Sequence, residues 1–152
     1  MALYFPMFVD LSEKTILFVG AGAVNSGRMK TMVDFAGKVI VVAPEADPLA
    51  SALAEAGLVD WRRRRFDEQD LEEADIVVTA TGHAGTDVRI AGMCHRRGIP
   101  VNVASDKTLC DFYFPGVARK DPLVVGVTAS GENHKMAAEA TAYFKKLLKD
   151  NR

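Results

Sequence analysis

The feature that most constrains the fold is an apolar run that breaks into closely spaced glycines and then continues with helical spacing. The run covers residues 15–19, and Gly20 and Gly22 follow it directly. In a nucleotide-binding βαβ unit, the first glycine permits a tight turn, and the second lets backbone N–H groups approach a pyrophosphate at the start of a helix. The stretch therefore predicts a strand, a phosphate-binding turn and a helix.

The glycine pattern of this turn is incomplete. The spacing G-x-G-x-x-G would place a third glycine at position 25, where the chain has Asn25, and the nearest glycine is Gly27. A glycine-rich turn that binds no nucleotide therefore remains the alternative at this point.

Length and charge limit the classes of protein that fit. A chain of 152 residues has room for one domain, or for one domain with a small appendage. Its 19 Lys and Arg against 20 Asp and Glu give a net charge of -1, so no general basic field attracts nucleic acid or an anionic membrane. Cys94 and Cys110 lack metal-ligand spacing, and no apolar run approaches the ~20 residues of a membrane-spanning helix. We expect a cytoplasmic protein with reduced cysteines and without a metal site, nucleic acid or membrane as partner.

Strand and helix patterns alternate along the first two thirds of the chain. Apolar, β-branched runs predict further buried strands at residues 38–43, 59–61, 75–80 and 99–104. Helical spacing predicts helices at residues 23–36, 48–56, 67–73 and 84–97. The alternation predicts an α/β fold over residues 1–107, a Rossmann-like, doubly wound parallel sheet with right-handed crossovers, with residues 4–11 packed beside the first strand.

The pattern changes after Ser105. Two strand-like runs, residues 109–114 and 123–128, predict an antiparallel pair, and a final helix is expected over residues 132–149. Two strands and one helix are marginal on their own. We therefore expect residues 108–152 to form a small α+β appendage that makes the protein a homodimer.

Four consecutive arginines, residues 62–65, are the densest charge in the chain. They could clamp phosphates or carboxylates, or they could form a solvated edge strand. Alternate residues of a strand point to opposite faces, so at most two of the four can converge on one ligand.

Several motifs, taken in their order and spacing, resemble the family of precorrin-2 dehydrogenases and sirohydrochlorin ferrochelatases, the N-terminal module of siroheme synthase. The resemblance extends nearly from end to end, through residues 4–8, 19–24, 41–45, 80–81, 101–103, 110–115 and 122–127. It implies an enzyme that uses NAD to oxidise the tetrapyrrole precorrin-2 to sirohydrochlorin, with ferrochelatase activity in some members.

One departure from the family concerns a carboxylate. The family commonly has an aspartate three residues after the Asn of an Asn-Val-x-Asp stretch, where this chain has Ser105, followed by Asp106. Oxidation releases a hydride to the nicotinamide and a proton to a base. We expect Asp106 to be that base, with His83 as a second candidate, although an aspartate that only turns the loop remains the alternative.

The turn and the resemblance together assign the other site residues. The expected cofactor-binding residues are Gly20, Ala21, Gly22, Ala23, Val24, Pro44, Glu45, Thr81 and Gly82. The expected substrate-binding residues are Arg28, Asn102, Ser105, Arg119 and Lys135, of which the basic ones would meet substrate carboxylates. Ala43 and Pro44 stand where an acidic residue often ends the second strand, and Glu45, the nearest carboxylate, would repel a 2′-phosphate, so we expect NAD rather than NADP.

Two other functions remain open at this point. One is a tetrapyrrole-binding chelatase or carrier that has lost hydride chemistry, which Ser105 would favour. The other is a nucleotide-sensing domain. Production of NADH from NAD and precorrin-2 would distinguish them.

Overall fold

The computed structural model describes residues 2–150, which form two compact units. One unit is Val9–Phe112, and the other consists of residues 2–8 and 113–150. The sequence predicted a boundary after residue 107 and placed residues 4–11 beside the first strand. In the structure the division lies between Phe112 and Tyr113, and Tyr4 instead stacks on Tyr113 in the second unit, with 4.4 Å between the ring centroids.

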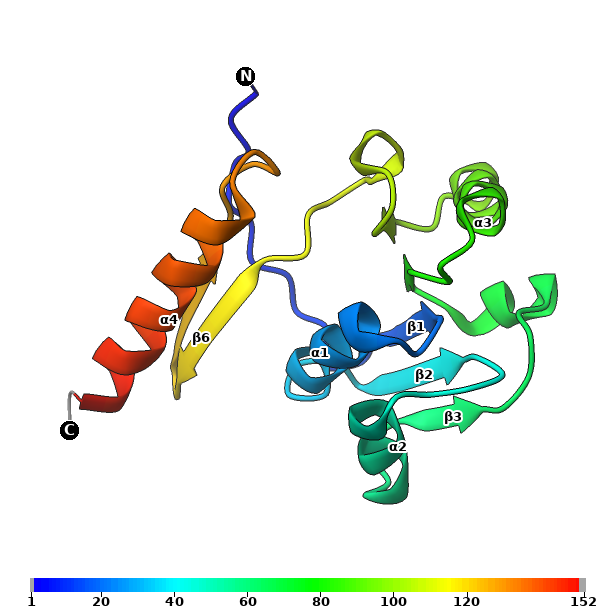
Figure 1. Ribbon diagram of the computed structural model, residues 1–152, viewed down its shortest axis with the longest axis horizontal. Coiled ribbons are helices and arrows are strands. Elements are labelled where there is room, and N and C mark those ends of the chain that lie inside the picture. Colours follow the sequence, from blue (N-terminus) through cyan, green and yellow to red (C-terminus); the bar gives the residue numbers. More distant parts are fainter. Residues whose placement is uncertain (1, 151–152) are drawn as a thin grey trace. The chain divides into compact units, whose positions relative to one another are not determined.

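The first unit is built on a five-stranded parallel sheet (Figure 1). Its strands are β1 (Thr15–Val19), β2 (Lys38–Val42), β3 (Asp60–Arg62), β4 (Ile76–Thr79) and β5 (Val101–Val103), and their order is β3-β2-β1-β4-β5. The β-branched runs form strands because side chains on both faces of a parallel sheet are buried. This order confirms the predicted doubly wound, Rossmann-like fold.

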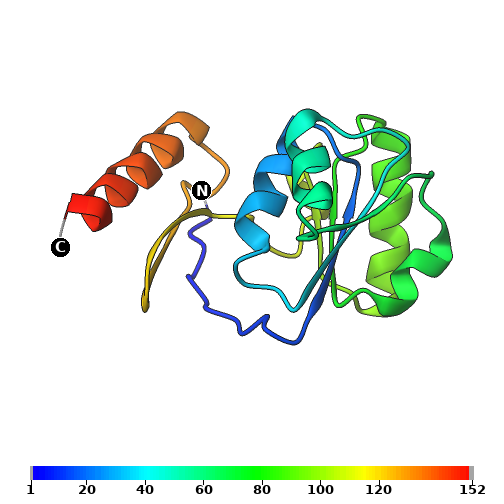
Figure 2. The same ribbon diagram turned by 90° about the horizontal axis from the view of Figure 1, so that it is seen from below.

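Helices cover both faces of this sheet. Helices α1 (Ala23–Met32) and α2 (Pro48–Glu55) lie on one face, and α3 (Ala84–Arg97) lies on the other (Figures 1 and 2). Side chains alternate along β1, so that Leu17 joins the core cluster of α3. Phe18, which is completely buried, points to the opposite face.

Helix α1 is shorter than predicted. It ends at Met32 rather than at residue 36, because the following residues form tight turns and the Gly37 amide donates to Leu11 O over 2.9 Å. A side chain at Gly37 would overlap the Ser12 carbonyl, which explains the glycine there. The predicted helix at residues 67–73 is the 3₁₀ helix η1 (Glu68–Glu73).

The second unit contains a β-hairpin and a helix. The hairpin consists of β6 (Gly116–Lys120) and β7 (Leu123–Val127), and α4 (His134–Asp150) packs on it. The predicted strand at residues 109–114 is wrong. This segment instead follows the short 3₁₀ helix η2 (Lys107–Leu109) and is held to β5, where the Asp111 amide donates to Val101 O over 2.9 Å.

Within residues 2–150, no helix combines the length and the hydropathy that a membrane crossing requires.

Candidate functional site

The carboxyl ends of the parallel strands bring most of the predicted site residues to one edge of the first unit. Gly20 follows β1, Pro44 follows β2, Thr81 follows β4 and Ser105 follows β5. Strands β1 and β4 are neighbours, although the chain visits β2 and β3 between them. Such a switch in winding direction is where open α/β sheets bind ligands.

Gly20 is required by the packing of the sheet. Its φ of 94° is unfavourable for other residues, and a Cβ there would overlap the Ala80 carbonyl oxygen at the end of β4. Its amide donates to Val42 O over 3.0 Å. Gly20 therefore lets the ends of β1, β2 and β4 approach one another. This is a packing role, whereas the predicted role was contact with a cofactor.

Gly22 has the opposite character. It is the N-cap of α1 with an ordinary φ of -81°, and a Cβ built there meets no atom within 4 Å. The first amides of a helix lack partners within the helix and attract anions. The glycine therefore leaves open space directly in front of the N-terminus of α1, next to Ala23 and the exposed Val24.

Asn25 occupies the place of the third glycine and is completely buried. Its Nδ2 donates to Val19 O over 3.0 Å and to Gly20 O over 2.9 Å, which ties α1 to the end of β1. Its Oδ1 is the one buried side-chain N or O atom without a hydrogen-bond partner among the described residues. In the sequence, Asn25 is a departure from the glycine pattern, and this departure is the signal for its role.

The loop after β2 lies against the same turn. The Asp47 amide donates to Ala21 O over 2.9 Å, and the Asp47 side chain accepts from Ser26 Oγ over 2.8 Å. Pro44 and Glu45 are exposed in this loop. These contacts bring the predicted cofactor-binding residues after β1 and β2 together.

Two side chains from the end of β3 also lie beside this loop: Trp61, which is part of β3, and Arg63, which follows the strand. Trp61 Nε1 donates to Ala43 O over 3.0 Å, and the Arg63 guanidinium stacks 4.1 Å from the Trp61 ring centroid. The sequence analysis did not place an arginine near the end of β2. The signal was the cluster of four arginines, whose individual directions could not be read from the sequence.

Asp87, on the first turn of α3, is a buried carboxylate that the sequence analysis missed. It is 1% exposed and lies at the ends of β4 and β5. Its Oδ1 accepts from Thr79 Oγ1 over 2.6 Å, from Thr81 Oγ1 over 2.9 Å and from the Thr81 amide over 3.2 Å, and its Oδ2 accepts from Ser105 Oγ over 3.3 Å. A single Asp in a helix gave no signal of this network.

Asp106 and His83, the predicted catalytic residues, follow β5 and β4 respectively. Asp106 caps η2, where its Oδ1 accepts from Thr108 Oγ1 over 2.6 Å and from the Thr108 amide over 2.9 Å. These two hydrogen bonds lower the pKa of Asp106. A lower pKa makes this carboxylate a weaker base. His83 is an exposed residue at the N-cap of α3.

Arg28 and Asn102 lie together, as residues of one predicted substrate site should. Arg28 Nη1 donates to Asn102 Oδ1 over 2.8 Å, and Asn102 Nδ2 donates to Phe112 O over 2.9 Å. Burial lowers the pKa of Arg28. The other two basic candidates, Arg119 and Lys135, belong to the second unit, where Arg119 pairs with Asp121 and Lys135 with Glu139.

Two of the four arginines at residues 62–65 form ion pairs within the protein. Arg62 and Arg64 both approach the buried carboxylate of Asp70, and Arg64 Nη2 lies 2.6 Å from Asp70 Oδ1. Burial opposes ionisation of Asp70, yet the hydrogen bonds from Arg64 and the Asp67 amide prevail and lower its pKa. The prediction that at most two arginines share one target agrees with this pairing.

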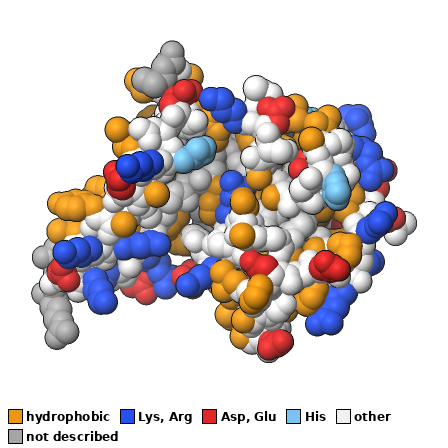
Figure 3. All heavy atoms as spheres, in the orientation of Figure 1, with side chains coloured by type: hydrophobic (Ala, Val, Ile, Leu, Met, Phe, Trp, Pro, Cys, Tyr) orange, Lys and Arg blue, Asp and Glu red, His pale blue; other side chains and the backbone are white. Residues whose placement is uncertain are grey.

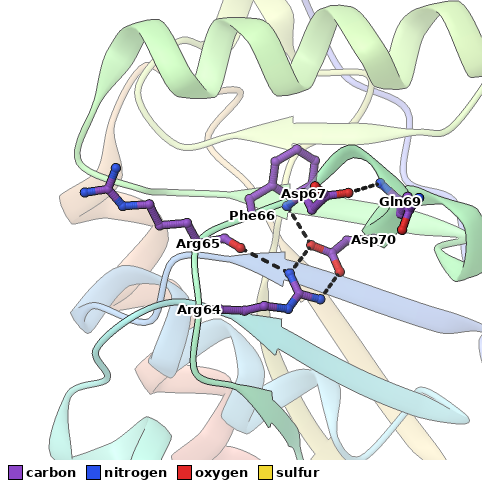
Figure 4. Close-up of a pocket in the computed structure, with 6 residues that line it drawn as sticks. All are labelled: Arg64, Arg65, Phe66, Asp67, Gln69 and Asp70. Atoms are coloured by element: carbon purple, nitrogen blue, oxygen red, sulfur yellow. Dashed lines mark hydrogen bonds and ion pairs between the residues drawn. The ribbon is translucent and has the colours of Figure 1, made fainter.

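A hollow of about 480 Å³ lies next to this ion pair (Figure 4). Arg64 turns toward Asp70, whereas Arg65 points away from it. The lining residues come from the segment after β3 and from the first turn of η1, and no residue of the glycine turn is among them. The hollow is therefore separate from the glycine turn.

The cysteines are not activated for chemistry. Burial raises the pKa of Cys94 to about 11 and also raises the pKa of Cys110. Both thiols are free. In the described part of the chain, no three His, Cys, Asp or Glu side chains converge as a metal site would require.

The fold and the glycine turn define a class: a domain that binds a dinucleotide at the carboxyl edge of a parallel sheet. Residues 7–116 match the family NAD_binding_7, which is described as "Putative NAD(P)-binding". The chain belongs to this NAD(P)-binding family. Membership supports a nicotinamide dinucleotide as the cofactor.

The chain is similar to curated proteins that are named for siroheme biosynthesis. It is 32% identical to the siroheme synthase of Methylococcus capsulatus over 136 residues, which are 90% of this chain and 29% of the relative. It is 29% identical to a multifunctional siroheme biosynthesis protein of Ruminiclostridium josui over 144 residues, which are 94% of this chain and 28% of the relative. The chain therefore spans less than a third of the length of these relatives.

A solved structure shares the fold. The chain matches SirC, a precorrin-2 dehydrogenase, with a TM-score of 0.74 and 21% identity, over 98% of this chain and 71% of SirC. At this identity the match shows that the fold is shared, whereas the family model and the curated relatives confirm the family resemblance predicted from the sequence.

Proposed function

We propose that this chain oxidises precorrin-2 to sirohydrochlorin with a nicotinamide dinucleotide as the hydride acceptor. The observation that carries the proposal is the glycine turn at the β1–β4 switch point, in a fold shared with a precorrin-2 dehydrogenase. The names of the curated relatives support the same pathway.

The residues after β1 fit the cofactor. Open space in front of Gly22 and the amides at the start of α1 suit a pyrophosphate, which is anionic and needs close backbone approach. The buried Asn25 Oδ1 has no hydrogen-bond partner among the described residues, which leaves an acceptor for an ordered water behind this turn. When bound, the nicotinamide would accept the hydride.

We expect NAD to be preferred to NADP. Glu45 is exposed after β2, where a carboxylate can accept from the ribose hydroxyls and repel a 2′-phosphate. Arg63 opposes this preference, because its stacking on Trp61 holds a cation near Ala43 at the end of β2. The preference should therefore be moderate.

The substrate would meet residues at the β4–β5 side of the same edge. Arg28, Asn102 and Ser105 are the candidates in the first unit, and Arg28 is the cation that can bind a carboxylate of the tetrapyrrole. Arg119 and Lys135 are further candidates in the second unit. Asp106 and His83 remain the proton acceptors predicted from the sequence, although the capping role of Asp106 weakens its case.

The second unit supports a homodimer. Ala118 and Leu148 are the buried hydrophobic residues described in it, which is a small core. Met136, Tyr143 and Leu147, at helical spacing on α4, are exposed by 60%, 62% and 39%, and hydrophobic side chains mix with charged ones on this unit (Figure 3). Burying such residues between two copies would stabilise the unit.

The direct test mixes the purified chain with NAD and precorrin-2 and follows NADH fluorescence. We expect NADH to form with one sirohydrochlorin per NADH. Failure to form NADH from NAD and failure to form NADPH from NADP, in the presence of correctly folded protein, would refute the dehydrogenase.

A second function has one observation in its favour. Ser105 stands in the family's Asp position, and the carboxylate of the next residue, Asp106, caps η2 through Thr108. A chelatase or carrier would need no proton acceptor for hydride chemistry. Insertion of Fe²⁺ into sirohydrochlorin without any nicotinamide would support this alternative.

A further inference from the structure

Asp87 and Ser105 form a pair that connects a buried carboxylate to the exposed edge of the sheet. Asp87 lies on α3 and is 1% exposed, whereas Ser105 is exposed on the loop after β5. A hydrogen bond of 3.3 Å from Ser105 Oγ to Asp87 Oδ2 joins them. Buried carboxylates are rare unless they are well paired, so this one needs an explanation.

The two oxygens of Asp87 are in different situations. Oδ1 accepts from both Thr79 and Thr81, and these contacts account for a purely structural role that anchors α3 to the end of β4. Oδ2 accepts from Ser105. Since a carboxylate oxygen has two lone pairs, Oδ2 keeps capacity for a proton.

The Ser105 hydroxyl is polarised by this arrangement. Its hydrogen points toward Asp87, so its own lone pairs are left for a donor on the exposed side. A hydroxyl that donates to a carboxylate becomes a better acceptor, which is the logic of nucleophiles and relays next to a base.

The neighbouring carboxylate is less suited to accept a proton. Asp106 Oδ1 accepts twice from Thr108, and this capping lowers the pKa of Asp106. A proton released at the end of β5 can thus reach a carboxylate by the other route, from Ser105 to Asp87.

We propose that Ser105 and Asp87 accept the proton of the dehydrogenation, which rests on the function proposed above. A hydride leaves a substrate carbon with both electrons and reduces the nicotinamide. A substrate N–H bond breaks, and its proton passes to Ser105 Oγ while the hydroxyl proton of Ser105 passes to Asp87 Oδ2. Asp87 becomes the neutral acid and returns the proton through Ser105 after the product leaves. Ser105 touches the substrate, and Asp87 is a positioning residue that acts through it.

Three variants test the pair. Ser105→Ala and Asp87→Asn should each lower kcat about a hundredfold, the lower end of the effect of a positioned acid or base, while the KM for NAD changes less than about twofold. Thr86→Ala on the same turn of α3 is the matched control and should keep kcat. The double variant Asp87→Asn with Ser105→Asp places a carboxylate at the exposed position and should regain most of the lost kcat.

The outcomes separate this pair from the function on which it rests. Wild-type protein that forms no NADH would overturn both the dehydrogenase and the pair. An active wild type with unchanged kcat in Ser105→Ala would overturn the pair alone, and a loss confined to Asp106→Asn would assign the base to Asp106. Failure of the rescue, with Asp87→Asn less thermally stable, would reduce Asp87 to a structural anchor; Ser105→Ala, at an exposed position, remains a test even if Asp87→Asn does not fold.

Discussion

The two sides of the sheet edge differ in how their polar groups are hydrogen-bonded. At the β1 side, Gly22 leaves space in front of α1, and the Asn25 Oδ1 atom has no partner. At the β4–β5 side, the side chains are hydrogen-bonded to one another, as Asp87 is to Thr79, Thr81 and Ser105. We expect the first side to bind the cofactor, because the space in front of Gly22 leaves the first amides of α1 open to an anion. The second side fixes side chains in place, which is what oriented chemistry needs.

The comparison extends to two glycines of one turn. Gly20 cannot gain a side chain without overlapping Ala80, whereas Gly22 can gain one without meeting the protein. Gly20 is therefore required by the fold, whereas we expect Gly22 to leave room for a ligand.

The largest effect is expected for Gly20→Ala. The positive φ and the overlap with the Ala80 carbonyl should reduce the free energy of unfolding by about 3 kcal/mol or more. Urea denaturation measures this loss. Gly22→Ala is the matched control and should lie within about 1 kcal/mol of wild type. Equal losses in the two variants would remove the distinction between the two glycines.

Gly22→Val should abolish cofactor binding and keep the fold. The branched side chain would fill the space that a pyrophosphate needs, so the Kd for NAD should rise about a hundredfold or more, equivalent to about 2.7 kcal/mol. Calorimetric titration gives the Kd, and circular dichroism checks the fold. Gly27→Ala, which also has open space for a Cβ but lies within α1, should bind NAD normally. Normal binding by Gly22→Val would mean that the turn is only structural.

Asp70 is a buried acid that has no contact with the glycine turn among its hydrogen bonds and ion pairs, so a change there tests stability apart from chemistry. Asp70→Asn removes the carboxylate that pairs with Arg64 and should cost about 2 kcal/mol of unfolding free energy at neutral pH, without changing the KM for NAD. Glu72→Gln, at an exposed position of the same 3₁₀ helix, is the control.

The effect of Asp70 should depend on pH with a definite sign. Its folded pKa lies below its unfolded value of about 3.9, so its contribution is present above that value and is lost as the pH falls through the folded pKa. The stabilities of wild type and Asp70→Asn should therefore begin to converge below about pH 4 and become equal only below the folded pKa of Asp70. A difference that persists in acid would show that packing, rather than ionisation, carries the effect.

The smallest effect is expected for cofactor preference. Arg63→Ala removes the cation stacked on Trp61 and should weaken NADP binding about fivefold, as expected for an exposed charge pair, with little change for NAD. Glu45→Ala should instead improve NADP binding. Calorimetry with both cofactors measures the two ratios, and tighter NADP binding by the wild type would contradict the expected preference for NAD.

The sequence predicted the parts of the fold that are coded locally. The run at residues 38–42 reads as a buried strand by itself, and the glycine at position 98 ends α3 with a φ of 67°. The apolar run at residues 109–114 read equally well as a strand. Its real position depends on Asp111 and Phe112 bonding to β5, which no local pattern contains.

The site was predictable to a similar degree. Gly22 was predicted from a motif and Arg28 from a resemblance, and the structure places both at the carboxyl edge of the sheet; their roles in binding stay predictions. Asp87 was missed because its partners come from β4 and from the loop after β5. Only the assembled fold brings these groups within hydrogen-bond distance.

The most direct test of this account maps where the cofactor contacts the chain. The ¹⁵N-labelled protein is titrated with NAD, and the shifts of its backbone amide NMR signals are followed. We predict the largest shifts at residues 22–25 after β1 and at Thr81 and Gly82 after β4, with Asp87→Asn leaving the pattern at residues 22–25 unchanged. Shifts confined to residues 64–70 around the separate hollow, or no shifts at all, would contradict the account.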